Sequence, residues 1–489
     1  GLNVTAGITT VQALQATTGT FSADSTVNGV TVGKGANSVA GNTVVGESAL
    51  DAATTGGNNV AIGLEALTAN TTGDGGVAVG RYSLRGNTTG VNNTAIGFNA
   101  LKTSTTASNN TAVGNEALTA NTTGTNNVAI GAASLDANTT GDYNTAIGKD
   151  SLTANTTGSN NVAVGRNAMI VNTTGESNTA VGRSALQQNA ASYNTGVGRD
   201  ALAANTTGAD NAAVGAEALD ANTTGDGNTA FGYRSLSANT TASNNTAVGK
   251  NSLLTNTTGY SNCAFGVGSL DANTTGSTNN AFGHNALGSN TTGTFNCAFG
   301  YAALTTATTV SNNTAMGHNA LTANTTGASN SAFGSTALDA NTTGSNQTAI
   351  GVGALSACTT GESNTSVGQA SLSSLVTGSN NTAVGRASLV SCLGSDNTAL
   401  GYYAGQSVTT GTDNVLIGYN AAIAITTGSD NTAIGSEALD ACVTGSYNTA
   451  VGARALSAST GSGSCAVGED ALMTASTGTQ NIAMGQSAM

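Results

Sequence analysis

The chain has no proline and no tryptophan, and only 8% of its 489 residues are charged. Soluble domains usually contain about 25% charged residues and about 5% proline. The scarcity of charge excludes a chain kept unfolded by its own charges, and Glu, Lys and Arg are too few for a coiled coil. The absence of proline, together with the lack of a Gly-X-Y period, excludes collagen.

The chain also lacks the run of about 18 apolar residues that a membrane-spanning helix needs. The longest candidate, residues 415–425, is short and is interrupted by Gly418, Tyr419 and Asn420. We therefore expect no membrane span. The formal net charge of −13 disfavours nucleic acid as a partner, because phosphate contacts need a basic surface.

Glycine is abundant, with 67 residues, and it marks an internal repeat. A segment of the type Asn-Thr-Ala-Val-Gly recurs 27 times, at intervals of 17 residues and, three times, of 16. Counted from its Asn, repeat position four is always a large apolar residue, position five is always Gly, and position nine is Leu in 23 copies. The three short intervals lose a residue from the Asn-Thr-Thr-Gly part, which predicts a turn there.

A 17-residue unit suits one coil of a β-solenoid. We predict an all-β fold, a parallel β-solenoid (β-roll) of about 27 coils over residues 42–489, preceded by a strand-rich lead-in or neck over residues 1–41. In the short strand of each coil, positions two and four share one face and position three points the other way. The chain stops at Met489, partway through a repeat, so we expect the natural chain to continue to a tip that carries specificity.

Identical neighbouring coils predict ladders of identical side chains along the stack. Positions four and nine are expected to form the structural core, position five the turn glycines, and position one an asparagine ladder. The expected core residues are Val113, Ile130, Ile147, Val164, Phe265, Phe282, Phe299, Leu118, Leu135 and Leu152. The expected turn glycines are Gly114, Gly131 and Gly148, and the expected asparagine ladder is Asn110, Asn127 and Asn144.

One thin coil stack has a small core for its length. About two large apolar side chains per coil contribute some 1.5–3 kcal/mol each when buried, whereas ordering each residue costs on the order of 1–2 kcal/mol. Burial of a further face between chains would offset this deficit. We therefore predict a parallel homotrimer that forms a long fibre.

The segment Asn-Val-Ala-Ile-Gly, at 59–63 and 127–131, resembles the head repeat of YadA-type trimeric adhesins. The resemblance covers residues 42–489 and implies three parallel β-rolls side by side with their apolar strands facing inward. The period departs from that family, whose head coils are typically shorter. The longer Ala-Leu-x-Ala-Asn-Thr-Thr-Gly repeats, and the opening segment 20–33, look like those of phage tail-fibre proteins.

Irregular positions leave alternatives open. Phenylalanines at position four predict a core ladder of stacked rings, or else a local swelling of the fibre. Around residues 402–425, where Gly405 and Ala422 replace Leu, the pattern predicts compensating repacking, with a bend or a partner-docking point as the alternative.

The six cysteines fall at two repeat positions: Cys263, Cys297 and Cys465 at position two, and Cys358, Cys392 and Cys442 at position twelve. Same-register cysteines lie at least two coils apart, beyond the Cα reach of a disulfide. We expect buried thiols, with a bridge between chains at position two as the alternative.

No site chemistry stands out. His284 and His318, at position six, and the basic residues that recur there are expected to face solvent, as are the aspartates at position ten, including Asp136, Asp220 and Asp271. We expect no catalytic residue, metal or cofactor, because the sequence shows no charged dyad, catalytic triad, phosphate loop or Cys-x-x-Cys spacing.

The leading functional hypothesis is a non-enzymatic adhesive fibre, such as a phage tail fibre or similar virion appendage, outside the cell on the virion surface. Its partners would be its own copies, the attachment apparatus, the distal receptor-binding tip and a host surface glycan or protein. The alternative is the head of a trimeric adhesin on a bacterial outer surface. A remoter alternative is an ice-binding solenoid, which would need threonines two residues apart, whereas Thr139 and Thr140 are adjacent.

Overall fold

A computed structural model describes residues 24–52, 54–474 and 477–489. The chain divides into two compact units, one up to Thr174 and one from Gly175. Both are all-β parallel β-solenoids built from the same coil, with a 17-residue repeat and about 26 turns in all. The predicted all-β, parallel β-solenoid with a 17-residue repeat is therefore confirmed.

The N-terminal unit opens with a hairpin rather than with a coil. The strand β1 (Ser25–Val27) pairs antiparallel with β2 (Val30–Gly33) around Asn28 and Gly29, which both have positive φ, as a tight hairpin turn requires. The strand β2 then pairs antiparallel with the first repeat strand, β3 (Thr43–Gly46). The described part of the predicted lead-in thus contains two strands, and its residues 1–23 lie outside the described structure.

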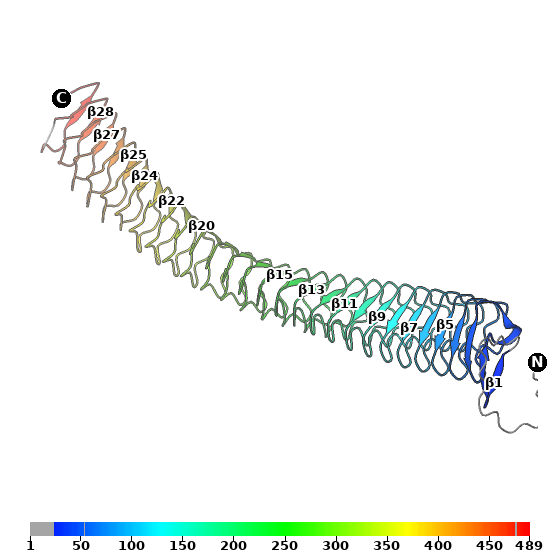
Figure 1. Ribbon diagram of the computed structural model, residues 1–489. Helices are drawn as coiled ribbons and strands as arrows, with labels where there is room; N and C mark the ends of the chain where they lie inside the picture. Colours follow the sequence, from blue (N-terminus) through cyan, green and yellow to red (C-terminus); the bar gives the residue numbers. More distant parts are fainter. Residues whose placement is uncertain (1–23, 53, 475–476) are drawn as a thin grey trace, which may run out of the picture. The chain divides into compact units, whose positions relative to one another are not determined.

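One short 3-10 segment, η1 (Ala36–Ser38), links the hairpin to β3. From β3 onward, each strand of the N-terminal unit pairs in parallel with the next, as Figure 1 shows in the row of arrows labelled β5, β7 and β9. The remaining strands of this unit are β4 (Val60–Ile62), β5 (Val77–Val79), β6 (Thr94–Ile96), β7 (Thr111–Val113), β8 (Val128–Ile130), β9 (Thr145–Ile147) and β10 (Val162–Val164).

The C-terminal unit continues the pattern with one strand per repeat. These strands are β11 (Thr179–Val181), β12 (Thr195–Val197), β13 (Ala212–Val214), β14 (Thr229–Phe231), β15 (Thr246–Val248), β16 (Cys263–Phe265), β17 (Asn280–Phe282), β18 (Cys297–Phe299), β19 (Thr314–Met316), β20 (Ser331–Phe333), β21 (Thr348–Ile350), β22 (Thr365–Val367), β23 (Thr382–Val384), β24 (Thr398–Leu400), β25 (Val415–Ile417), β26 (Thr432–Ile434), β27 (Thr449–Val451), β28 (Cys465–Val467) and β29 (Ile482–Met484).

The three shortened repeats keep the strands in register. Thr179 pairs with Thr195, Thr382 with Thr398, and Thr449 with Cys465, although each pair is 16 residues apart rather than 17. The residue is lost in the loop before the second strand of each pair. The prediction that this segment is a turn that tolerates a deletion is confirmed.

Backbone hydrogen bonds link neighbouring coils around the whole perimeter, well beyond the strands. In the coil that begins at Asn110, the amides of Leu118, Ala120 and Thr122 each donate to a carbonyl of the next coil at 2.9 Å. Proline has no N–H to donate, so at each of these positions it would remove a bond between coils. This explains why proline is absent from the turns as well as from the strands.

Position five needs glycine for two reasons. At Gly131 φ is +137°, a conformation that residues with a side chain rarely adopt. A Cβ there would also lie only 2.5 Å from the carbonyl oxygen of Gly148 in the next coil. The same close approach recurs at Gly114, whose φ is +140°, so any side chain at this corner would push neighbouring coils apart.

Candidate functional site

Each strand has one face turned into its coil and one face turned outward. Position three, not position four, points into the coil: Ala112, Ala129 and Ala146 have no exposed surface. Position four lies on the outer face, where Ile130 is 39% and Ile147 37% exposed. The prediction that position four belongs to the interior of the coil is therefore wrong.

This correction applies to every position-four residue expected in the core. Each is half-buried or exposed, and none is enclosed by its own coil. These residues are Val113, Ile130, Ile147, Val164, Phe265, Phe282 and Phe299.

Size explains the reversal. The turn at position five brings Leu at position nine back beneath the strand, so the space facing the strand accepts a methyl group but not a branched side chain. Where position three does carry a leucine, at Leu416, position nine is reduced to Gly405 in one coil and Ala422 in the next. Leu416 is fully buried, and its Cδ1 lies 2.5 Å from where a Cβ of Gly405 would be. Compensating repacking at 402–425 is thus confirmed.

The phenylalanines form a stacked ladder on the outer face. Ring centroids of Phe265 and Phe282 are 4.8 Å apart, those of Phe282 and Phe299 are 4.4 Å apart, and the ring planes are within 7° of parallel. The predicted stacking is present, but on the surface of the coil rather than in its interior.

The other predicted ladders lie inside the coil. Leu118, Leu135 and Leu152 are completely buried. The asparagines of position one are buried as well, at Asn110, Asn127 and Asn144. Their side chains form hydrogen bonds with backbone groups and do not only bond to the asparagine side chains of neighbouring coils. The Oδ1 of Asn127 accepts the N–H of Asn144 at 2.9 Å, and its Nδ2 donates to the carbonyl of Gly141 at 2.8 Å.

A second buried asparagine ladder, at position twelve, was missed from the sequence. The Nδ2 of Asn138 donates to Oδ1 of Asn121 in the preceding coil at 2.8 Å and to the carbonyl of Gly141 at 3.0 Å. A signal was available: where position twelve is not Asn, it is Ser, Ala, Val, Ile, Leu or Cys, and it is never charged.

The two groups of cysteines have different surroundings. Cys358, Cys392 and Cys442, at position twelve, are buried thiols, and burial raises the pKa of Cys392 to about 11. Cys263, Cys297 and Cys465, at position two, are only half-buried on the outer strand face. The expectation of buried thiols therefore holds only for position twelve.

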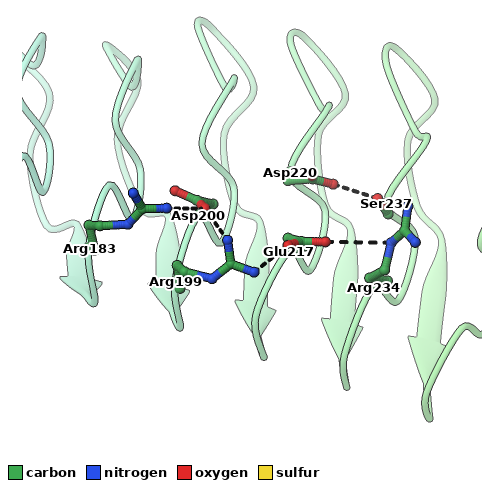
Figure 2. Close-up of polar contacts among 7 residues, drawn as sticks. All are labelled: Arg183, Arg199, Asp200, Glu217, Asp220, Arg234 and Ser237. Carbon is green, nitrogen blue, oxygen red and sulfur yellow. Dashed lines mark hydrogen bonds and ion pairs between the residues drawn. The ribbon is translucent and has the colours of Figure 1, made fainter.

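Oppositely charged side chains form a ladder across four coils of the C-terminal unit (Figure 2). The carboxylate of Asp200 lies 3.0 Å from the guanidinium groups of both Arg183 and Arg199. Arg199 also pairs with Glu217, whose other oxygen lies 3.5 Å from Arg234. About half of each arginine side chain is exposed, so these pairs contribute little stability individually, but they let charges stack without repulsion.

Position six is exposed, as predicted, and it carries a second aromatic stack. The His284 and Tyr301 rings are 5.5 Å apart, the Tyr301 and His318 rings are 5.3 Å apart, and both pairs are tilted by 12°. The two histidines flank the tyrosine and do not converge. Within residues 24–52, 54–474 and 477–489, no three His, Cys, Asp or Glu side chains come together as a metal site would require.

The position-ten aspartates are less exposed than predicted. Asp136, Asp220 and Asp271 are half-buried, and burial is the main cause that raises the pKa of each. Oδ1 of Asp136 has no hydrogen-bond partner. The interpretation of position ten as a fully solvated edge is wrong, because these side chains lie against the neighbouring coil.

A shallow hollow of about 330 Å³ opens beside position-ten residues of the C-terminal unit. It is lined by Asp271, Ala272, Asn285, Gly288, Ser289 and Thr305. It lies where Gly288 removes the position-ten side chain between Asp271 and Thr305.

Comparisons with known proteins assign no family. No protein-family model matches the chain, and no curated protein matches it. In the part of the chain that the structure describes, no helix has both the length and the apolar character to cross a membrane.

Proposed function

We propose that the chain is the shaft of a non-enzymatic fibre in which three parallel copies bury their strand faces against one another. The observation that carries this proposal is the uninterrupted row of Val, Ile, Leu, Met and Phe side chains at position four. Soluble monomers rarely expose contiguous apolar patches beyond a few hundred Å², and larger ones mark interfaces. A parallel trimer would cover this row and leave the charged ladder of Figure 2 in solvent.

Such a shaft suits a virion appendage, most simply a phage tail fibre, that holds a receptor-binding tip away from the particle. The resemblance to trimeric adhesin heads, whose strands face inward, supports the same packing. Gene context separates the two settings: neighbouring tail genes support the virion appendage, whereas a secretion signal and an outer-membrane anchor in the full gene support a bacterial surface adhesin.

Thiol alkylation combined with mass measurement tests the packing. Sedimentation equilibrium of the native protein should give three times the chain mass of 47.1 kDa. In that assembly the half-buried thiols of Cys263, Cys297 and Cys465 should resist iodoacetamide, and they should react once the assembly is dissociated.

Cys392 provides the matched control, because it is buried within its own coil and should resist iodoacetamide until the chain unfolds. A monomeric mass, or rapid native alkylation at position two, would contradict the trimer. A disulfide between chains at position two, seen as a reducible dimer on a denaturing gel, would support close approach of the strand faces.

A further inference from the structure

The hollow lies at Gly288, the single glycine at repeat position ten, a position that links neighbouring coils wherever it carries threonine. At position ten, Thr68, Thr119, Thr153, Thr305 and Thr322 each donate a hydroxyl to the position-seven carbonyl of the preceding coil, at 2.8–3.1 Å. Gly288 has no side chain to do so, and the equivalent carbonyl, that of Gly268, lacks this donor. The missing side chain leaves both an open volume and unmatched polar groups.

The side chains around the hollow supply both acceptors and donors. Asp271 Oδ1 lies 3.5 Å from where a Cβ of Gly288 would be, so the carboxylate faces the empty volume. Asn285 contributes an amide and Ser289 a hydroxyl, while the hydroxyl of Thr305 is anchored on the carbonyl of Asn285 at 3.1 Å. Ala272 and the Cα of Gly288 give the lining an apolar part.

The charge of this lining narrows the choice of ligand. A phosphate or carboxylate would be repelled by Asp271, the one charged group in the lining. A simple cation would satisfy Asp271 but leave the amide N–H groups of Asn285 and the hydroxyl hydrogen of Ser289 without an acceptor. Hydroxyl groups donate and accept at once, so a neutral polyhydroxylated ligand matches the whole set.

The size of the hollow and the residues next to it also suit a sugar ring. The volume lies at the lower end of the range for small-molecule sites. The exposed stack of His284, Tyr301 and His318 begins one residue before Asn285. An aromatic side chain is thus the chain neighbour of one residue that lines the hollow.

We propose that the hollow around Gly288 binds a single neutral sugar residue, with its hydroxyl groups on Asp271, Asn285 and Ser289. The inference rests on the proposed function, since it gives the shaft a contact of its own with surface polysaccharide. Because the hollow is shallow and open, we expect a dissociation constant on the order of 1 mM for a monosaccharide.

The test is saturation-transfer NMR on the full chain with methyl glycosides of neutral hexoses. At least one glycoside should receive saturation from the unmodified protein. The Gly288→Thr variant should abolish the transfer, because it introduces the threonine that five other coils carry at this position and fills the hollow. A Cβ at Gly288 would lie 3.3 Å from its nearest neighbour, the carbonyl oxygen of Asn285, so this variant should fold after a slight adjustment.

Two aspartate variants make the test specific. Asp271→Asn should weaken binding at least about tenfold while keeping the shape of the side chain. Asp339→Asn changes the same repeat position between Thr322 and Ser356, where no glycine opens a gap, and should leave binding unchanged.

Absence of transfer from every glycoside, or equal transfer to Gly288→Thr, would overturn the proposal. So would binding of methylammonium in place of the glycosides, which would make the hollow a cation site. The test separates this proposal from the trimer. Sugar binding by a monomeric chain would support the sugar site and contradict the trimeric fibre. A trimer that binds no glycoside would support the fibre and contradict the sugar site.

Discussion

Position ten of the repeat shows how a single functional group governs the contact between coils. Threonine there donates a hydrogen bond to the carbonyl of position seven in the preceding coil, at 3.1 Å for Thr153. Aspartate has no proton to donate at neutral pH, and Oδ1 of Asp136 remains without a partner. The side chain at position ten therefore has a hydrogen bond between coils at Thr153, whereas Oδ1 of Asp136 has none.

We predict that Asp136→Thr stabilises the protein at pH 7. The hydroxyl can donate to the carbonyl of Glu116, 20 residues earlier, as in the other threonine coils, which should contribute about 0.5–1.5 kcal/mol. The folded state raises the pKa of Asp136, mainly by burial. The stability that comes from its neutral form is therefore complete below the unfolded pKa of about 3.8 and is lost as the pH rises through the folded value.

The advantage of Asp136→Thr should accordingly shrink when the pH falls below about 4. Urea unfolding midpoints at pH 7 and pH 3.5 measure both effects. The reverse change in an adjacent coil, Thr153→Asp, should destabilise the protein at pH 7. Equal midpoints for Asp136→Thr and the unmodified protein at pH 7 would refute this account of position ten.

At the scale of one coil, the strand and the turn beneath it share a fixed volume. Leu416 occupies the space that leucine at position nine fills in other coils, and Gly405 and Ala422 leave room for it. The side chain at position three and the side chains at position nine therefore depend on one another, because a larger side chain at one position requires a smaller one at the other.

A double-mutant cycle tests this exchange of volume. Leu416→Ala should cost about 2–5 kcal/mol through the cavity it leaves. Gly405→Leu should also destabilise, because its Cβ would lie 2.5 Å from Cδ1 of Leu416. In the double variant the leucine at position 405 can fill the space that Leu416 vacates, and the coil of residues 397–413 gains the usual pattern of Ala399 at position three with leucine at position nine, so much of the loss should be recovered. Additive losses, measured as free energies of unfolding in urea, would show that the two sites are not coupled.

The sequence predicted the coil, its period, its invariant glycine and the buried leucines, because each depends on a residue type that recurs at one spacing. It failed at the strand faces. In Thr145-Ala146-Ile147 the most apolar residue suggests the interior, whereas the narrow coil admits only the alanine. That limit depends on the distance between strand and turn, which no pattern of hydrophobicity contains.

The polar features were also beyond the sequence. The ladder of Figure 2 depends on charges at positions six and seven meeting across coils, and those positions vary from repeat to repeat. The hollow at Gly288 is a departure in one coil, so periodicity could not indicate it. The asparagines of position twelve, in contrast, could have been identified as buried, since no copy is charged.

At the scale of the whole molecule, stability is a sum over nearly identical coils and their neighbours. We predict that removal of residues 228–244, one complete repeat, leaves the fold intact, because Asn245 takes the place of Asn228 in the register. Circular dichroism per residue should not change, and the dependence of unfolding free energy on urea should fall only in proportion to the lost surface.

Removal of nine residues, 228–236, is the matched control, because it deletes one strand and one buried leucine without restoring the register. This variant should lose cooperative unfolding in urea. Equal tolerance of both deletions would argue against stacked coils in this part of the chain.

The position-one asparagines bear on the order in which the coils can form during synthesis. Each side-chain oxygen accepts the N–H of the coil that follows it in the chain, as Asn127 accepts that of Asn144. A ribosome adds about 5–20 residues per second, so a new 17-residue coil emerges every ~1–3 s onto a surface already shaped to receive it. Synthesis can therefore extend the solenoid in the order in which it is read, with no need to bring distant parts of the chain together.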